Sequence, residues 1–274
     1  MSAVTVTALT VAAEQPSAAT PTLWGLAASG TLVAMAVAIS AWRRLGVERA
    51  VLWAATRAVV QLAAIGAALT VVVRPDAPLA WSWAWVVAMI IFAAVTVRRR
   101  SPEVPAAFAM GLLAFSATTL VSLAVLFGFG IFALSPRTIV PLAGMVVGNS
   151  LSSVVLAARR TIGELRDHRD QVESRLALGL TARAAAQPQL RAAIRDALIP
   201  QVETTKSVGL VFLPGAMVGL ILAGVEPADA VRVQLAVMYL ILGSVAVTTT
   251  VMVLGVSTRL FTPDQRLSEL PQAD

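Results

Sequence analysis

The chain contains no cysteine, one histidine and one lysine among its 274 residues. Without cysteine it can form no disulfide, no thiolate nucleophile and no thiolate metal site. Charged residues make up only 13% of the chain, whereas a soluble domain has about 25%. Hydrophobic residues make up 58%, and the mean hydropathy is +0.81. This composition predicts a polytopic membrane protein with one membrane domain.

The scarce residue types also exclude most catalytic sites. Lys206 precedes Ser207, but the preceding QVETT has no glycine to cradle a phosphate, which argues against ATP binding through a phosphate-binding loop. The serines of GNSLSS, around Asn149, would need a histidine base, and no histidine lies in a predicted span. His168 falls in a charged segment, where a solvated side chain is expected. We therefore expect a protein that is not an enzyme and has no catalytic residues and no cofactor of its own.

Seven apolar segments are long enough to cross a bilayer, since about 20 helical residues at 1.5 Å each cover its roughly 30 Å core. They are predicted at residues 23–42, 51–73, 79–97, 104–132, 139–158, 207–224 and 230–256. The fourth is longer than needed and contains Gly128 and Gly130, so it should end early or tilt. No Asp or Glu lies in any predicted span, which argues against proton-coupled transport through a membrane carboxylate.

The predicted fold is all-α, with about seven transmembrane helices and a helical insertion between spans five and six. The membrane domain is expected at residues 22–257, with the insertion at 159–206, an N-terminal tail at 1–21 and a C-terminal tail at 258–274. Of the 21 basic residues, 17 fall on the insertion's side of the membrane, which the positive-inside rule makes cytoplasmic. The N-terminus is then outside and the C-terminus inside, in the cytoplasmic (inner) membrane. Cysteines introduced at Arg166 and Asp76 should be labelled from opposite sides.

The insertion is amphipathic and is expected to form two helical halves around Gly179 and Pro188, ending at Pro200. Its apolar residues recur at helical spacing, at Ile162, Leu165, Val172, Leu176, Leu190, Ile194 and Leu198. One interpretation is a helix lying on anionic lipid. The alternative is a helix whose apolar stripe enters the groove of a soluble partner. Charges of both signs on the insertion favour the protein partner.

Two predicted spans hold a G-x-x-x-G spacing, which puts two glycines on one helix face and lets another helix approach closely. The pairs are Gly144 with Gly148 and Gly215 with Gly219. We expect these four glycines to lie at helix contacts, whereas Val147 is expected to face lipid.

Three segments carry a family resemblance. They are RTIVPLAGMVVGNSLSSVVLAARR, ESRLALG and AAIRDALIPQVETTKSVGLVFLPGAMVGLILAGVEPADAVRVQ. With RAVVQLAAIGAAL, they resemble the permease subunit of the Fet-type (FetB) family, ABC transporter permeases described as iron exporters, to which plant aluminium-tolerance permeases are similar. The resemblance implies a permease homodimer that works with a cytosolic ABC ATPase dimer, which holds the ATP and Mg²⁺. No nucleic-acid partner is expected.

The insertion is then expected to couple the ATPase to the membrane domain. Glu173 and Gly179 have the E-x-x-x-x-x-G spacing of the coupling loop in many ABC importer permeases, although Pro200 lies further downstream than that loop's proline. A helix that docks in the ATPase would use Glu173 to fix its register and would bury apolar side chains such as Leu176 and Leu178.

The polar and thioether groups left in the predicted spans are candidates for a translocation pathway: Arg57, Gln61, Met145, Asn149 and Met217. Arg57 either snorkels to the interface or lines a cavity. The resemblance favours export of iron, yet the spans lack the usual ligands of transition metals, so no metal site is assigned. The alternatives are a non-metal substrate such as a sugar nucleotide or anion, a standalone channel or secondary carrier, and a scaffold for a soluble partner.

Overall fold

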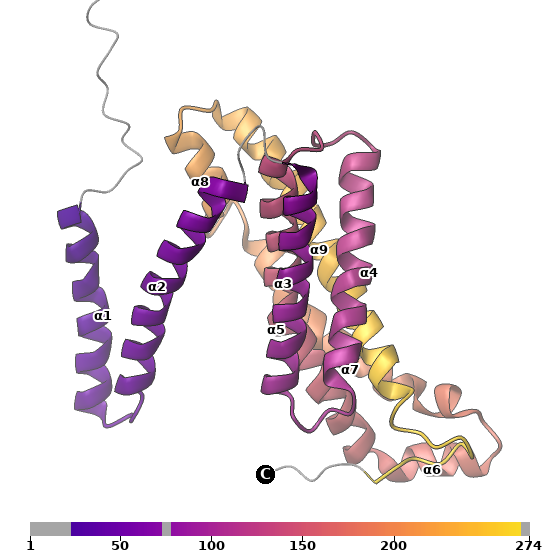
Figure 1. The fold of residues 1–274 in the computed structure, drawn as a ribbon. Helices are drawn as coiled ribbons and strands as arrows, with labels where there is room; N and C mark the ends of the chain where they lie inside the picture. The colour runs from indigo at the N-terminus through magenta and orange to yellow at the C-terminus, as the bar shows by residue number, and fades with distance from the viewer. Residues whose placement is uncertain (1–22, 73–77, 270–274) are drawn as a thin grey trace, which may run out of the picture. The chain divides into compact units, whose positions relative to one another are not determined.

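The computed structural model describes residues 23–72 and 78–269, which form nine helices and no strand (Figure 1). The helices are α1 (Leu23–Arg43), α2 (Glu48–Val72), α3 (Leu79–Arg100), α4 (Ala107–Gly128), α5 (Pro136–Asp167), α6 (Arg169–Ala177), α7 (Ala182–Ser207), α8 (Gly215–Leu222) and α9 (Pro227–Ser257). The expectations for the N-terminal tail and for Asp76 lie outside the described residues. The prediction of an all-α fold is confirmed.

Six of these helices are long and apolar enough to cross a membrane, namely α1 to α5 and α9. Their bounds agree with six of the seven predicted spans to within a few residues, except that α5 continues about two turns further, to Asp167. The fourth span ends early, as predicted, because α4 stops at Gly128 and Gly130 takes a left-handed backbone with φ of +66°. The chain is a multi-pass membrane protein.

The segment predicted as the sixth span, 207–224, does not form a single helix. α7 ends at Ser207, Gly209 has a φ of +84°, and Pro214 precedes α8, which has 8 residues. At 1.5 Å per residue α8 covers only about 12 Å, less than half of a bilayer core. The glycine and the proline break the helix because one takes a left-handed backbone and the other has no N–H.

The contacts divide the chain into two compact units. The first comprises the described residues 23–70 and 213–234, and the second comprises 71–212 and 235–269. In the first unit, α1 turns into α2 through Gly46, whose φ is +71°. The Ser40 hydroxyl donates a 2.7 Å hydrogen bond to Glu48 Oε1 and so joins the two helices across this turn.

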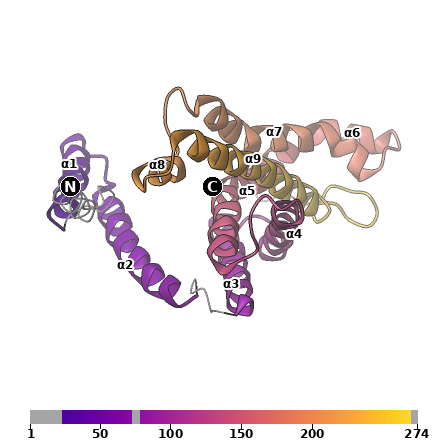
Figure 2. The same ribbon diagram turned by 90° about the horizontal axis from the view of Figure 1, so that it is seen from above.

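The core of the second unit lies where α3, α4 and α5 pack together, with α7 beside α5 (Figure 2). Its largest fully buried side chains include Val97, Phe115, Ile139, Val146, Val154 and Leu165. Both α5 and α7, which pack together, carry fully buried alanines: Ala157, Ala158, Ala185, Ala186, Ala193 and Ala197. Small side chains of this kind let two helix backbones approach closely.

The insertion differs from the predicted pair of halves. The break comes at the turn containing Gly179, as expected, but α7 continues through both Pro188 and Pro200. Each proline removes one backbone hydrogen bond from the helix. Both prolines are exposed, whereas the buried alanines of α7 belong to the same core as the buried residues of α5. Tertiary packing therefore keeps the helix continuous where its sequence predicts an end.

The predicted packing glycines have few neighbours in a single copy of the chain. A Cβ built on Gly144 would lie 3.8 Å from Met89 Sδ, and one on Gly148, Gly215 or Gly219 would meet nothing within 4 Å among the described residues. The role of these four glycines at helix contacts therefore stays a prediction. Val147 is only 6% exposed, so its assignment to the lipid face is wrong.

Two other glycines make the close approaches. A Cβ on Gly111 would lie 3.4 Å from Ala94 Cα, where α4 crosses α3. One on Gly255 would lie 2.7 Å from Met110 Sδ, where α9 crosses α4. Neither glycine belongs to a G-x-x-x-G pair, which is why the sequence pattern missed both.

Candidate functional site

One end of the second unit is closed by a band of charges that we call the arginine belt, formed by Arg98, Arg99, Arg100, Glu103, Arg159, Arg160 and Asp196. Arg159 Nε lies 3.1 Å from Glu103 Oε1, and its guanidinium also donates to the Arg100 carbonyl. Arg160 Nε lies 3.5 Å from Asp196 Oδ2, which ties α5 to α7. The belt ends the apolar lengths of α3 and α5 at one level, as expected at a membrane surface.

Beyond the belt, α5 extends to Asp167 and α6 follows at once (Figure 1). Arg175 holds α6 against α7, because its guanidinium donates 3.0 Å hydrogen bonds to the Ala185 carbonyl and to Gln189 Oε1. Gln189 is only 4% exposed and lies 3.4 Å from Gln171 of α6. This polar contact holds α6 against α7, and together with the end of α5 they form one projection beyond the belt.

The apolar stripe of the insertion points inward, which corrects the expectation that it would enter a partner's groove. Leu165 and Val172 are fully buried, and Leu176 packs against the same core. What the projection exposes is the turn after α6, where Leu178 is 80% exposed and Gly179 takes a φ of +88°. The Gly179 N–H donates to the Leu176 carbonyl at 2.9 Å, so the turn is closed rather than loose.

Glu173 lies on the exposed side of α6. Its Oε1 accepts a 2.6 Å hydrogen bond from Arg169 Nε, one helical turn earlier. Pro200 is exposed on α7 and lies at the opposite side of the belt from this turn. The structure therefore brings Glu173, Leu176, Leu178 and Gly179 together but leaves Pro200 apart from them.

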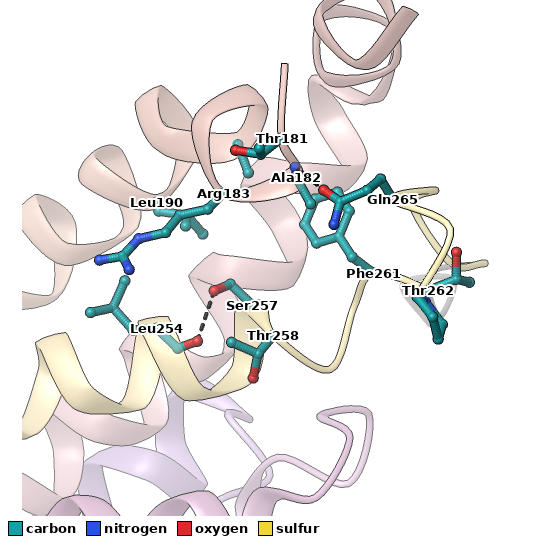
Figure 3. Close-up of a pocket in the computed structure, with 12 residues that line it drawn as sticks. Thr181, Ala182, Arg183, Leu190, Leu254, Ser257, Thr258, Phe261, Thr262 and Gln265 are labelled. Atoms are coloured by element: carbon teal, nitrogen blue, oxygen red, sulfur yellow. Dashed lines mark hydrogen bonds between the residues drawn. The ribbon is translucent and has the colours of Figure 1, made fainter. Parts of the chain in front are cut away.

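The C-terminal residues complete this surface as a small hairpin, which the sequence reading missed. Phe261 pairs with Leu267, and the Thr262 N–H donates to the Arg266 carbonyl at 2.8 Å. Figure 3 shows Gln265 reaching from the hairpin to the backbone N–H of Ala182, with an N···O distance of 2.5 Å. The apolar residues that flank the T-P-D-Q turn are a hairpin signal, which the expectation of a short polar tail overlooked.

Two clefts border the hairpin. One, of about 470 Å³, lies between the start of α7, the end of α9 and the hairpin (Figure 3), and is lined among others by Thr181, Arg183, Leu190, Ser257, Phe261 and Gln265. The other, of about 300 Å³, lies between α6 and the hairpin and is lined by Arg169, Glu173, Leu176, Gln265, Arg266 and Leu267. The turn after α6 and the hairpin thus lie side by side, and we call the face that they form the docking face.

The candidate pathway residues are divided between the two units. Arg57, Gln61 and Met217 belong to the first unit, in which both α2 side chains are exposed. Met145 and Asn149 belong to the second, where Asn149 is exposed and its amide donates to the Met145 carbonyl at 2.8 Å. Their role in transport stays a prediction. Among the described residues, no three His, Cys, Asp or Glu side chains lie together as a metal site.

Comparison with known proteins places these features in a family. A model of an uncharacterised protein family, UPF0014, matches residues 23–261. The chain belongs to this family. It is 36% identical over 217 residues to the UPF0014 membrane protein STAR2 of Oryza sativa subsp. japonica, covering 79% of this chain and 76% of that protein.

Two further relatives are a bacterial and a plant protein. The probable iron export permease protein FetB of Escherichia coli is 33% identical over 228 residues, which cover 82% of this chain and 86% of that protein. The protein ALUMINUM SENSITIVE 3 of Arabidopsis thaliana is 30% identical over 225 residues, covering 81% of each. No solved structure matches the chain. Of these three relatives, FetB is the one whose name gives a transport activity, as a probable iron export permease.

Proposed function

We propose that this UPF0014 protein is the membrane-spanning subunit of an ABC-type exporter of metal cations, driven by a separate cytosolic ATPase. The observation that carries the proposal is the docking face. It is a rigid helical projection beyond the arginine belt, braced by Arg175 and ending in an exposed leucine. A soluble partner that closes on nucleotide needs such a rigid element to pull on the helices behind it.

The placement of charge supports the orientation. The arginine belt, the projection and the hairpin all belong to the Arg-rich side, which the positive-inside rule makes cytoplasmic. The ATPase would then meet α6 from the cytosol. Six spanning helices leave the termini on opposite sides only with one further crossing, which the end of α7 and α8 would supply together, and the N-terminus is then outside and the C-terminus inside. A permease of this kind would act as a homodimer in the cytoplasmic membrane, with ATP and Mg²⁺ held by the ATPase dimer.

The substrate class is supported by the relatives. One bears a name for iron export and another a name for aluminium sensitivity, so metal cations are the chemistry that these two names share. Export is the direction that the first of these names gives. A standalone channel or secondary carrier would not need the projection, and it would transport without an ATPase.

The test changes Leu178 to Asp and compares it with Leu176→Asp. Leu178 is exposed at the tip of the projection, so a carboxylate there should release the ATPase while the permease stays folded. Leu176 packs against the core, so its replacement should disturb the fold itself. The measurements are co-purification with a co-expressed candidate ABC ATPase, and monodispersity in detergent. Gln187→Asp, on an exposed part of α7, controls for the added charge.

Metal transport is measured in proteoliposomes that hold the permease, with the ATPase and ATP on the outside. We expect ATP-dependent uptake of Fe²⁺ by wild type and none with Leu178→Asp. Uptake without the ATPase would identify a carrier or channel. A Leu178→Asp variant that still binds the ATPase and still transports would show that the docking face does not bind the ATPase.

A further inference from the structure

The course of α7 differs from the predicted one, because the helix continues past the arginine belt and carries Glu203 beyond it. α7 begins beside α6, passes the arginine belt at Asp196 and runs on beside the apolar part of α5 (Figure 1). Leu198, just past the belt, packs against Val237, Ile241 and Val245 of α9, in the same apolar cluster as Met145 of α5. The second half of α7 therefore rises from the belt into the membrane layer.

The helix rise sets an upper limit on the depth. From Asp196 to Ser207, α7 advances about 16 Å along its own axis at 1.5 Å per residue, and the helix is tilted (Figure 2), so its end lies at most about half-way into the roughly 30 Å core. Its last two turns are polar, with the sequence QVETTKS. Glu203 and Lys206 form an ion pair there, with Nζ 2.8 Å from Oε1, and nothing in the second unit covers it, since their side chains are 62% and 66% exposed.

A second observation points to an aqueous site at the same level. Residues 208–212 leave the helix in a tight turn, in which the Gly209 N–H donates to the Phe212 carbonyl at 3.0 Å. Non-helical backbone at membrane depth is tolerated only where it is buried in protein or lines a water-filled cavity. An ion pair as exposed as this one also needs water, a ligand or other protein against it, because a charge facing lipid costs several kcal/mol.

The charge of the ligand follows from the end of the helix. A helix C-terminus carries a partial negative charge on its free carbonyls, and half-helices that end near the midplane of transporters use these carbonyls to bind cations. Around the end of α7 stand the Glu203 carboxylate and the hydroxyls of Thr204, Thr205 and Ser207. These hydroxyls donate to carbonyls of their own helix, and Thr205 Oγ1 also accepts from the Gln201 amide at 3.5 Å, so each keeps at least one lone pair as an acceptor.

We propose that Glu203 is the membrane-embedded carboxylate that receives the cationic substrate, and that Lys206 is its counter-ion when the site is empty. The arriving cation displaces the Lys206 ammonium from the carboxylate. The surrounding donors are all oxygens, which suit hard cations and disfavour soft ones that prefer thiolates. This inference rests on the proposed export function and names the binding residue within it. It also gives the spans the carboxylate that they lack in the sequence reading.

The depth of α7 is tested first, by labelling single cysteines in the cysteine-free chain in native membrane vesicles. Arg166→Cys, on the projection, should react with a small methanethiosulfonate and with a polyethylene-glycol maleimide too bulky to enter a helix bundle. Thr204→Cys should react with the small reagent alone. Equal reaction of both variants with the bulky reagent would place the end of α7 outside the membrane and overturn the proposal.

Binding is tested with Mn²⁺, a hard cation whose free form is measured by EPR, on the full-length permease in lipid nanodiscs without ATP. Glu203→Gln should weaken Mn²⁺ binding by at least the roughly 10-fold that loss of even an outer-shell partner costs. Lys206→Met should strengthen it, because the competing ammonium is gone. Glu226→Gln, which removes a carboxylate from the first unit, should bind like wild type. A structural defect would weaken both the Glu203 and the Lys206 variants.

Unchanged Mn²⁺ affinity in Glu203→Gln, or weaker affinity in Lys206→Met, would overturn the inference. The result is separable from the proposed function, because binding is measured without the ATPase. A permease that binds Mn²⁺ through Glu203 but transports no metal with its ATPase would support the binding site and contradict the export function. A Glu203→Gln variant that exports normally would support the export function and contradict the binding site.

Discussion

The two units of this protein bury their apolar helices to very different extents. In the first unit α2 buries none of its most apolar stretch, and in the second α5 buries half of its own. Yet the two helices have similar mean hydropathy over these stretches, 1.5 and 1.8. Hydropathy therefore identifies a helix that can cross a bilayer but does not say whether protein or lipid covers it. Within its own unit, α2 leaves almost its whole surface to be covered by lipid or by other protein.

This contrast predicts where the fold is most easily broken. Gly111→Leu in the second unit should have the largest effect, because even a Cβ there would lie 3.4 Å from Ala94 Cα and 3.6 Å from Val97 Cβ. A leucine must push α3 and α4 apart, and overpacking of this kind costs about 1–3 kcal/mol or more. Gly66→Leu in α2 is the matched control, since a Cβ there meets nothing within 4 Å.

The measurement is thermal unfolding in detergent, followed by size-exclusion chromatography. Gly111→Leu should lower the midpoint and reduce the monodisperse fraction, whereas Gly66→Leu should leave both unchanged. Similar losses from both substitutions would show that α2 is as tightly packed as α4, and would remove the contrast between the units.

A smaller and more local effect is expected where the second unit extends beyond the arginine belt. Arg175→Ala removes both hydrogen bonds that join α6 to Ala185 and Gln189 of α7. A buried group left without its partner costs about 1–3 kcal/mol of stability. We expect this loss to destabilise α6 alone, because the packing of α3, α4 and α5 does not depend on Arg175. Hydrogen exchange over 169–177 should accelerate while exchange in α3 to α5 stays the same.

Arg191→Ala, on an exposed position of α7, is the control for the lost positive charge. If Arg175→Ala accelerated exchange throughout the unit, the projection would be part of the global fold rather than a separate lever. If it changed nothing, apolar contacts such as that of Leu176 would hold α6 without the arginine.

The sequence predicted the spans well and their packing poorly, for a physical reason. Length and hydropathy determine whether a helix can cross a bilayer, so α1 to α5 and α9 were all found, and the glycines after α4 marked its end. Which face of a helix is buried depends on partners distant in the chain. The burial of Val147 and the close approach of Gly111 to α3 were therefore not predicted, because both depend on neighbours that are distant in the sequence.

The same reason explains the errors in the candidate site. Pro188 and Pro200 are local signals for a helix end, but the alanine contact with α5 is not local and overrides them. A helix that ends at Pro200 leaves Glu203 in the cytoplasmic insertion, so the sequence did not indicate Glu203 as a residue of the membrane layer. The exposed turn at Gly179 was found because a glycine between two helical patterns is a local signal.

The smallest expected effect concerns polar contacts inside the second unit. The Thr248 hydroxyl donates to Thr118 Oγ1 at 2.9 Å, which links α9 to α4 in the buried core. Hydrogen bonds between membrane helices average about 0.6 kcal/mol in double-mutant cycles, because the alternative states also find partners. Thr118→Val should therefore cost far less than Gly111→Leu.

The cycle uses Thr118→Val, Thr248→Val and the double variant, and the measurement is the free energy of unfolding in mixed micelles. Thr250→Val is the control, because its hydroxyl donates only to the Ala246 carbonyl of its own helix, at 2.7 Å. A coupling energy near 0.6 kcal/mol would mean that close packing contributes more than hydrogen bonding to the stability of the second unit. A coupling energy as large as the loss in Gly111→Leu would instead make the buried hydroxyls the main link between α4 and α9.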